Sequence, residues 1–294
     1  MAASTNTDIL LGRPWWRNAY RRTRSLRLPW ISVSIVAILL ICAAFAPLLA
    51  PHDPSLISML DAKIAPGEDM KYPLGTDIMG RDMLSRLIYG ARTSVFISLV
   101  ALGTGAFVGT VVGLTAGFRA GLFDALTMRA ADAALGFPTI LVAMVIVVLL
   151  GAGIESIILA VVLTVWARFA RMIRGEVLSI KEMDFITAAK IAGVRMPVII
   201  WRHVFPNTVN TLMVITSIQV GQVILLEASL SFLGLGLPVG EPAWGIMVSE
   251  GKAVILDAWW LSLLPGLAIT GVVLALNFFG DWMRDALDPK LRRL

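Results

Sequence analysis

Long apolar segments alternate with shorter charged segments along the chain, a pattern that predicts repeated crossing of a membrane. Residues 30–50 carry no charge, and no small-x-small cleavage pattern follows them, so we expect an uncleaved first transmembrane helix. Further spans are expected at residues 93–118, 133–153, 208–234 and 258–280. Another span, the fourth along the chain, is expected to start at about residue 155. The expected fold class is therefore all-α, with six transmembrane helices.

The fourth expected span has few uncharged residues. Residues 156–167 are the whole uncharged stretch between Glu155 and Arg168, whereas a helix needs about 20 residues to cross a membrane. We therefore expect the helix to continue through Arg168, Arg171 and Arg174, whose long side chains would reach the membrane interface.

The lysines and arginines between the spans predict the orientation of the chain. The four segments on the side that holds both ends contain 6, 2, 7 and 4 lysines and arginines, 19 in all. The two segments on the other side contain 5 and 1, 6 in all. By the positive-inside rule, we expect a cytoplasmic tail at 1–29, a cytoplasmic loop at 168–207 and a cytoplasmic tail at 281–294. Residues 51–92 are then extracytoplasmic. A short charged loop containing Arg119 and Asp132 would join the second and third spans.

Composition agrees with a polytopic membrane protein, because 57% of the residues are hydrophobic and 15% are charged. The single cysteine, Cys42, excludes an intrachain disulfide, and the two histidines lie far apart. We expect no metal and no cofactor. The net charge of +5 fits membrane orientation better than nucleic-acid binding. Membrane lipid is an expected partner.

Nucleotide-binding motifs are lacking from the sequence. The nearest string to a phosphate-binding loop, Gly245 to Lys252, has one residue too many between its glycines and is followed by Ala253. We therefore expect that the chain is not an enzyme and does not hydrolyse ATP itself.

The second expected span carries small residues at four-residue intervals. They place a ridge without side chains on one face of the helix, where another helix can pack backbone to backbone. The sequence leaves open whether that helix belongs to this chain or to a second subunit. The glycines of the ridge are Gly105, Gly109, Gly113 and Gly117.

The fifth expected span is the most polar, and polar groups are costly in hydrocarbon, so this helix should face protein or a water-filled path. We expect Gln219, Gln222 and Glu227 to line a translocation path. For Glu227 there are two readings, a lining residue near the outer gate or a structural carboxylate paired with a neighbour.

The longest charged interruption in the second half, residues 168–206, contains a short predicted helix. Asp184 is placed to cap its first free N–H groups, Ala188 and Ala189 favour helix, and Gly193 suits the left-handed residue that ends it. A second short helix, 196–205, is expected to end at Pro206.

The spacing of Ala188, Ala189, Gly193 and Pro206 resembles the cytoplasmic signature of binding-protein-dependent ABC import permeases. In that family this loop forms a coupling helix that sits in a groove of the ATPase subunit. The signature differs here at three positions: Thr187 stands where the family has Glu, His203 where it has Ile, and Phe205 where it has Leu. The resemblance implies an ATPase-coupling site at Asp184, Thr187, Ala188, Ala189, Gly193 and Pro206, against the alternative of an ordinary amphipathic loop.

Residues 74–82 and 85–92 resemble the segment before the second helix in C-type permease subunits of dipeptide, oligopeptide and nickel importers. Residues 230–236, 242–245 and 281–290 also match, so the resemblance covers nearly the whole chain. Within the first segment, Asp82 and Arg86 stand one helical turn apart and are expected to pair. The tryptophans Trp244, Trp259 and Trp260 are expected in an outer interfacial belt.

The resemblance implies a type I, MetI-like permease fold with a five-helix core at 93–280, in the inner (plasma) membrane. It also implies a second, B-type permease subunit, one or two ABC ATPase subunits and an extracytoplasmic substrate-binding protein. The cargo would be dipeptides, oligopeptides or nickel. A secondary transporter or channel that works without ATP would be favoured by paired buried ions or by broken helices in matching halves, and the sequence shows no convincing inverted repeat. A membrane enzyme would need clustered nucleophile, base or metal ligands near one face, and the sequence lacks them.

Overall fold

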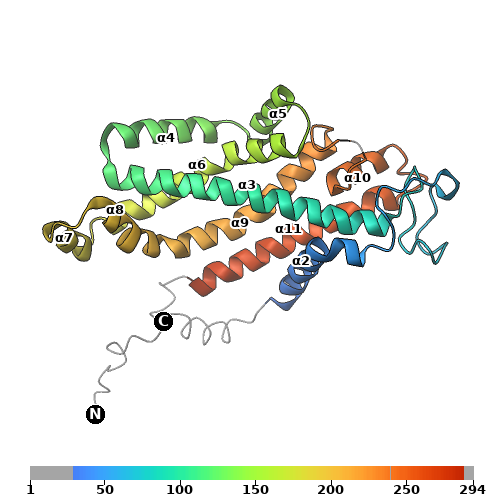
Figure 1. Cartoon of the computed structure of the whole chain (residues 1–294), viewed down its shortest axis with the longest axis horizontal. Helices are drawn as coiled ribbons and strands as arrows, with labels where there is room; N and C mark the ends of the chain where they lie inside the picture. The colour runs from blue at the N-terminus through green and yellow to red at the C-terminus, as the bar shows by residue number, and fades with distance from the viewer. Residues whose placement is uncertain (1–28, 239, 288–294) are drawn as a thin grey trace, which may run out of the picture.

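The computed structural model describes residues 29–238 and 240–287, and every regular element in this part of the chain is a helix (Figure 1). The expected tail 1–29 falls almost wholly outside these residues, as does the end of the tail 281–294. The elements are α2 (Trp30–Leu49), η2 (Met59–Asp61), α3 (Met83–Arg119), α4 (Gly121–Gly136), α5 (Thr139–Leu150), α6 (Ile154–Ile180), α7 (Asp184–Ile191), α8 (Met196–Ile199), η3 (Ile200–Val204), α9 (Phe205–Phe232), α10 (Trp244–Lys252) and α11 (Trp260–Leu287).

Helices α3, α6, α9 and α11 run side by side along the long axis of the molecule, with α4 on one flank and α2 on the other (Figure 1). Helix α7 lies at one end, which we call the α7 end. The polar segment 50–82 and helix α10 lie at the opposite end, the α10 end. Buried apolar side chains from α3, α6 and α9, such as Ile97, Phe169 and Val223, form the centre of the core.

Two helices are longer than the predicted spans. Helix α3 begins at Met83, ten residues before the expected span at 93–118, and α11 continues through residues 281–287, which we expected in the tail. The early start of α3 has a local cause, because the Asp82 carboxylate accepts hydrogen bonds from the backbone N–H groups of Leu84 and Ser85. Asp82 is therefore the N-cap of the helix.

The third span differs most from the prediction. Residues 133–153 do not form one helix, because α4 ends at Gly136 and α5 starts at Thr139 with a bend of 94° between them. Pro138 explains the break, since it lacks an N–H group and forces the preceding Phe137 into extended backbone, φ −102° and ψ 147°. The expected charged loop before this span is helical instead and forms α4. Within residues 29–238 and 240–287, five helices are long and apolar enough to span a membrane, or six if α4 and α5 count as one span.

The glycine ridge of α3 lies against α6 of the same chain. A Cβ atom added at Gly109 would lie 2.3 Å from the carbonyl oxygen of Trp166, and one added at Gly113 would lie 2.6 Å from that of Ala170. Such distances are possible only because the glycines have no side chain. The ridge thus joins α3 to α6 within this chain.

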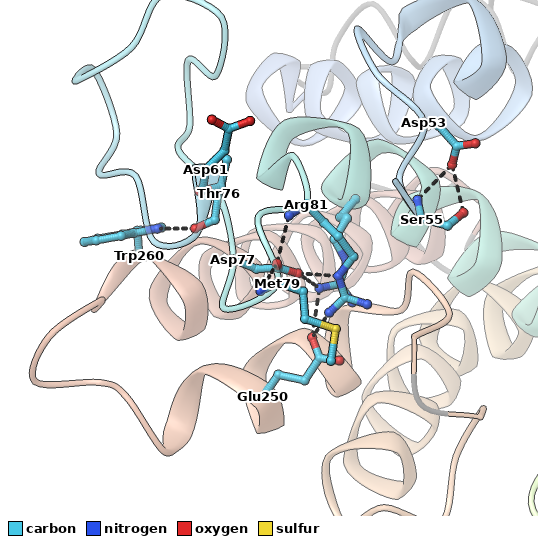
Figure 2. A network of polar contacts seen from close by, with 10 residues as sticks. Asp53, Ser55, Asp61, Thr76, Asp77, Met79, Arg81, Glu250 and Trp260 are labelled. Atoms are coloured by element: carbon cyan, nitrogen blue, oxygen red, sulfur yellow. Dashed lines mark hydrogen bonds and ion pairs between the residues drawn. The ribbon is translucent and has the colours of Figure 1, made fainter. Parts of the chain in front are cut away.

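At the α10 end, a buried ionic cluster fastens the polar segment to the helices. The cluster consists of Asp77, Arg81, Arg86 and Glu250, and Figure 2 shows Arg81 between Asp77 and Glu250. Arg81 Nε lies 2.6 Å from Asp77 Oδ2, Arg86 also contacts Asp77, and Arg86 Nη1 lies 2.8 Å from Glu250 Oε2. The expected pairing of Arg86 with Asp82 is wrong, because Asp82 is occupied as the helix cap.

The rest of the polar segment is held by glycines and hydroxyl groups. Gly75 and Gly80 have positive φ, and a Cβ at Gly80 would lie 1.8 Å from the carbonyl oxygen of Ser58. Ser58 and Tyr72 donate hydrogen bonds to the carboxylate of Asp61, which lowers the pKa of that carboxyl below its ordinary value. The segment is therefore ordered by its own contacts.

Two of the three tryptophans expected in an interfacial belt are buried instead. Trp244 donates a hydrogen bond from Nε1 to the carbonyl oxygen of Leu87, and Trp260 donates one to that of Thr76, as Figure 2 shows for the second pair. Trp259 is exposed. A sequence pattern cannot separate these cases, because a tryptophan suits a membrane interface and a buried hydrogen-bonded site equally well.

Candidate functional site

Helix α7 projects at the end of the bundle (Figure 1) and is fastened to it mainly by the side chain of Ile186. Ile186 is fully buried among Leu114 of α3, Ile173 and Val177 of α6, and Val204 of η3. Lys190 places its ammonium group over the ring of Phe118, 5.5 Å from the centroid. A force on α7 would therefore reach the ends of α3 and α6 directly.

The opposite side of α7 is exposed and largely apolar. Ile191 is 83% exposed, and Phe185 and Met183 are also open to solvent. The small residue Ala188 is exposed between them, together with Thr187 and Asp184. The sequence-predicted coupling residues 184, 187 and 188 thus lie at the surface, while Ala189 is half-buried against the core.

The ends of α7 follow the predicted chemistry only in part. Gly193 adopts φ +75°, and the N–H of Val194 donates to the carbonyl oxygen of Ala189, which closes the helix as a Schellman motif. Asp184, however, is the first helical residue and its side chain does not cap the helix; the N-cap position is Met183. An acidic residue in the first turn still interacts favourably with the helix dipole.

Pro206 does not end a helix, contrary to the prediction. It is the second residue of α9, and because the chain is helical from Met196 to Phe232, the proline lies inside a continuous helical stretch. The π-helix η3 immediately precedes α9 and widens the turn in which the proline ring would otherwise clash with a carbonyl oxygen. The short helix before Pro206 and the fifth span are therefore one continuous element.

Two open cavities lie on the side of α6 and α9 that also carries α5. One measures about 230 Å³ and is lined by residues including Thr139, Arg168, Gln219 and Gln222. The other measures about 520 Å³ and is lined by residues including Arg168, Gln219, Leu135 and Ile218. Arg168 and Gln219 border both. Two of the three predicted path residues, Gln219 and Gln222, are thus brought together beside an arginine that the sequence placed at the interface.

Arg168 is held by neutral groups from two other helices. Its Nη1 donates to Oε1 of Gln222 at 2.6 Å and to Oε1 of Gln219 at 3.4 Å, and its Nη2 donates to Oγ1 of Thr139 at 3.1 Å. The other two arginines of α6 bind carboxylates of α4: Arg174 Nε lies 2.5 Å from Asp124, and Arg171 contacts Asp132. All three arginines therefore bind side chains of neighbouring helices.

Glu227 is the path residue that the structure separates from the others. It is 0% exposed, it lines neither cavity, and it accepts hydrogen bonds from Ser94 Oγ of α3 at 3.1 Å and from Ser231 Oγ at 2.9 Å. Of its two readings, the contacts favour a structural carboxylate that joins α9 to α3.

Sequence reasoning missed the partners of the charged residues at both sites. The sequence pattern does not predict that Thr139 binds Arg168 or that Glu250 binds Arg86, although the charge of Glu250 lies close to an apolar span. A signal existed for Glu250, because an acid beside buried helices needs a cation, and Arg81 and Arg86 were available. Thr139 carries no such signal.

Comparison with known families matches two models to this chain. Residues 109–293 match the binding-protein-dependent transport system inner membrane component, and residues 14–66 match the N-terminal TM domain of oligopeptide transport permease C. The first model covers every helix from α4 to α11, which include both sites described above.

Curated relatives are similar over almost the whole chain. The dipeptide transport system permease protein DppC of Bacillus subtilis is 36% identical over 94% of this chain and 86% of its own length. The oligopeptide transport system permease protein OppC of the same organism is 34% identical over 95% of this chain and 90% of its own length. The glutathione transport system permease protein GsiD of Escherichia coli is 38% identical over 94% of this chain and 91% of its own length. This chain therefore belongs to the family of inner membrane components of binding-protein-dependent transport systems.

Proposed function

We propose that this chain is one of two permease subunits of an ABC importer for short peptides. Its relatives are named for dipeptides, oligopeptides and glutathione, which share a peptide backbone and a free carboxylate. The cavities beside Arg168 open on the flank that carries α5, where a second, related B-type permease would complete the path. A substrate-binding protein would deliver the cargo at the α10 end.

The observation that carries the coupling part of the proposal is the geometry of α7. A short helix that projects from the bundle, exposes apolar side chains and is fastened to α3 and α6 through Ile186 is suited to dock on another protein and to transmit its movement. We propose that the partner is an ABC ATPase, with Asp184, Thr187, Ala188, Ala189 and Gly193 at or beside the contact. Pro206 would act by shaping the start of α9.

The lysine and arginine distribution supports a cytoplasmic α7 end, with both termini on that side. The ATPase would then meet α7 where ATP is available. The same lysine and arginine distribution supports the proposed division of the chain into a first span, an extracytoplasmic segment and a five-helix core.

Purification of the tagged chain from its native membrane in mild detergent tests the assembly. We expect a second permease and one or two P-loop ATPases in stoichiometric amounts by mass spectrometry. A folded chain recovered alone would instead favour an ATP-independent transporter.

Uptake tests the cargo. Deletion of the gene is expected to abolish ATP-dependent uptake of radiolabelled dialanine or trialanine, and the wild-type gene is expected to restore it. Uptake of nickel ions rather than peptides by the restored strain would contradict the peptide assignment while leaving the importer assignment intact.

A further inference from the structure

Arg168 lies about halfway along the helix that carries it. It is the fifteenth of the 27 residues of α6, so it stands about 21 Å along the helix axis from Ile154 at ~1.5 Å per residue. Gln219 is likewise the fifteenth of the 28 residues of α9. A guanidinium group at this depth is costly unless it meets water, an anion or a carboxylate.

Arg168 differs in this respect from the other two arginines of its helix. Arg171 and Arg174 each have an aspartate of α4 as counter-charge. Among the residues that the structure describes, no acidic side chain lies within 4.0 Å of Arg168. Glu176, which also lines the larger cavity, follows it by eight residues, about 12 Å along the helix at ~1.5 Å per residue.

A second, independent feature at the same place is an unused hydrogen-bond donor. Gln219 is 5% exposed, and its Nε2 has no hydrogen-bond partner although the residue borders both cavities. A buried amide without a partner costs free energy, so its persistence beside a cavity points to a group that occupies the site for part of the cycle. That group must be an acceptor.

We propose that Arg168 and Gln219 form a carboxylate-binding site in the translocation path, which takes the free C-terminal carboxylate of the cargo as it passes. Both residues border the two cavities, and a guanidinium group binds a carboxylate through two parallel hydrogen bonds. The cargo carboxylate would replace the neutral oxygens of Gln222 and Thr139, which accept hydrogen bonds from the guanidinium. Because these oxygens carry no full charge, they are easily exchanged. The identity of the cargo as a peptide rests on the proposed function.

The test compares two peptides that differ only at this group. The assembled transporter in proteoliposomes, with its binding protein, is given trialanine or trialanine amide, and the ratio of the two uptake rates is measured. Any preference of the binding protein is the same for every permease variant, so the change in the ratio reports the permease. Arg168→Gln is expected to lower the ratio of acid to amide uptake about tenfold, as the loss of one charge-assisted contact implies. Arg168→Lys is expected to retain part of the preference.

Arg174→Gln is the matched control, because it removes the same charge from an arginine of the same helix that lines neither cavity and is paired with Asp124. It is expected to keep the wild-type ratio. An equal fall in uptake of both peptides in Arg168→Gln would overturn the proposal. Loss of the second permease from the purified Arg168→Gln complex would also overturn it, and would show that Arg168 pairs with an acid of that subunit instead.

A second measurement does not depend on the cargo. Modification of Arg168 by phenylglyoxal in the purified complex, followed by mass spectrometry, is expected to slow in acetate but not in acetamide at the same salt concentration. Arg174, which lines neither cavity, serves as the internal reference. If the wild-type complex takes up neither peptide, the peptide assignment fails, and protection by acetate still decides whether Arg168 binds carboxylates. Absence of protection would contradict the site itself.

Discussion

The indole nitrogen of Trp244 donates a hydrogen bond to the carbonyl oxygen of Leu87, 2.9 Å away and 157 residues earlier in the chain. The ring also lies over Gly90, where an added Cβ atom would stand 2.6 Å from its Cδ1 atom. Trp244 therefore fastens α10 to the first turns of α3, next to the buried Asp77, Arg81, Arg86 and Glu250 cluster. The hydrogen bond and the ring packing together hold α10 against α3.

Replacement of Trp244 should destabilise this end in two steps. Trp244→Phe loses the hydrogen bond, about 1 kcal/mol, and Trp244→Ala also loses the packing, for a total of about 3–5 kcal/mol. The midpoint of thermal unfolding of the purified protein in detergent measures both. Trp259→Phe is the control. Because Trp259 is exposed, its replacement should leave the unfolding midpoint unchanged.

Gly90 and Trp244 should also be coupled. Gly90→Ala alone forces the new methyl group against the indole ring and is expected to lower the unfolding midpoint. The same change in the Trp244→Ala background should cost little, because the ring is gone. Additive effects of the two substitutions would contradict the contact.

The ionic cluster predicts a strong effect of removing a single charge. Glu250→Gln leaves two arginines beside one aspartate in a buried site, and it is expected to cost about 3–5 kcal/mol. Unfolding in detergent again provides the measurement, with the exposed Glu241→Gln as the matched control. The double variant Arg86→Met with Glu250→Leu should be more stable than either single variant, since it leaves Asp77 and Arg81 as a neutral pair. A double variant as unstable as the sum of the singles would argue against the pairing.

The glycine ridge predicts opposite outcomes for two glycines of one helix. Gly109→Ala places a methyl group 2.3 Å from the Trp166 carbonyl oxygen and should separate α3 from α6, at a cost of about 1–3 kcal/mol. Gly103 has open space around its Cβ position, so Gly103→Ala should be neutral or slightly stabilising, by up to about 1 kcal/mol. Equal responses of the two variants in thermal unfolding would show that the close approach of the helices is not the cause.

The α7 surface predicts a loss of coupling without a loss of folding. Ala188→Asp puts a charge on an exposed position, so the protein should insert normally, while ATPase co-purification and peptide uptake should fall to background. Gly193→Trp should act in the same way, with additional strain of about 1 kcal/mol because Gly193 has φ +75°. Leu256→Asp, at a 97% exposed position of the opposite end, should retain the ATPase. Normal uptake by the Ala188→Asp variant would refute the coupling assignment.

Several features could be predicted from the sequence because they depend on neighbours along the chain. The apolar runs, the helix at Asp184–Ile191 and its left-handed Gly193 are local consequences of hydrophobicity, helix propensity and backbone freedom. The glycine ridge is also local, since a four-residue interval places small residues on one helix face whatever lies opposite. The break at Pro138 follows from local chemistry too, but a proline near a helix entrance is compatible with either a straight span or a bent pair.

Tertiary structure alone decided which charges meet. Arg86 has a carboxylate one turn away in Asp82, yet it binds Asp77 and Glu250, because capping the start of α3 uses the nearer acid. Arg168 likewise stands beside cavities and binds Thr139, the first residue after the 94° bend between α4 and α5. Pairing energies depend on distance and on the burial of each group, and both are set by how helices far apart in sequence pack.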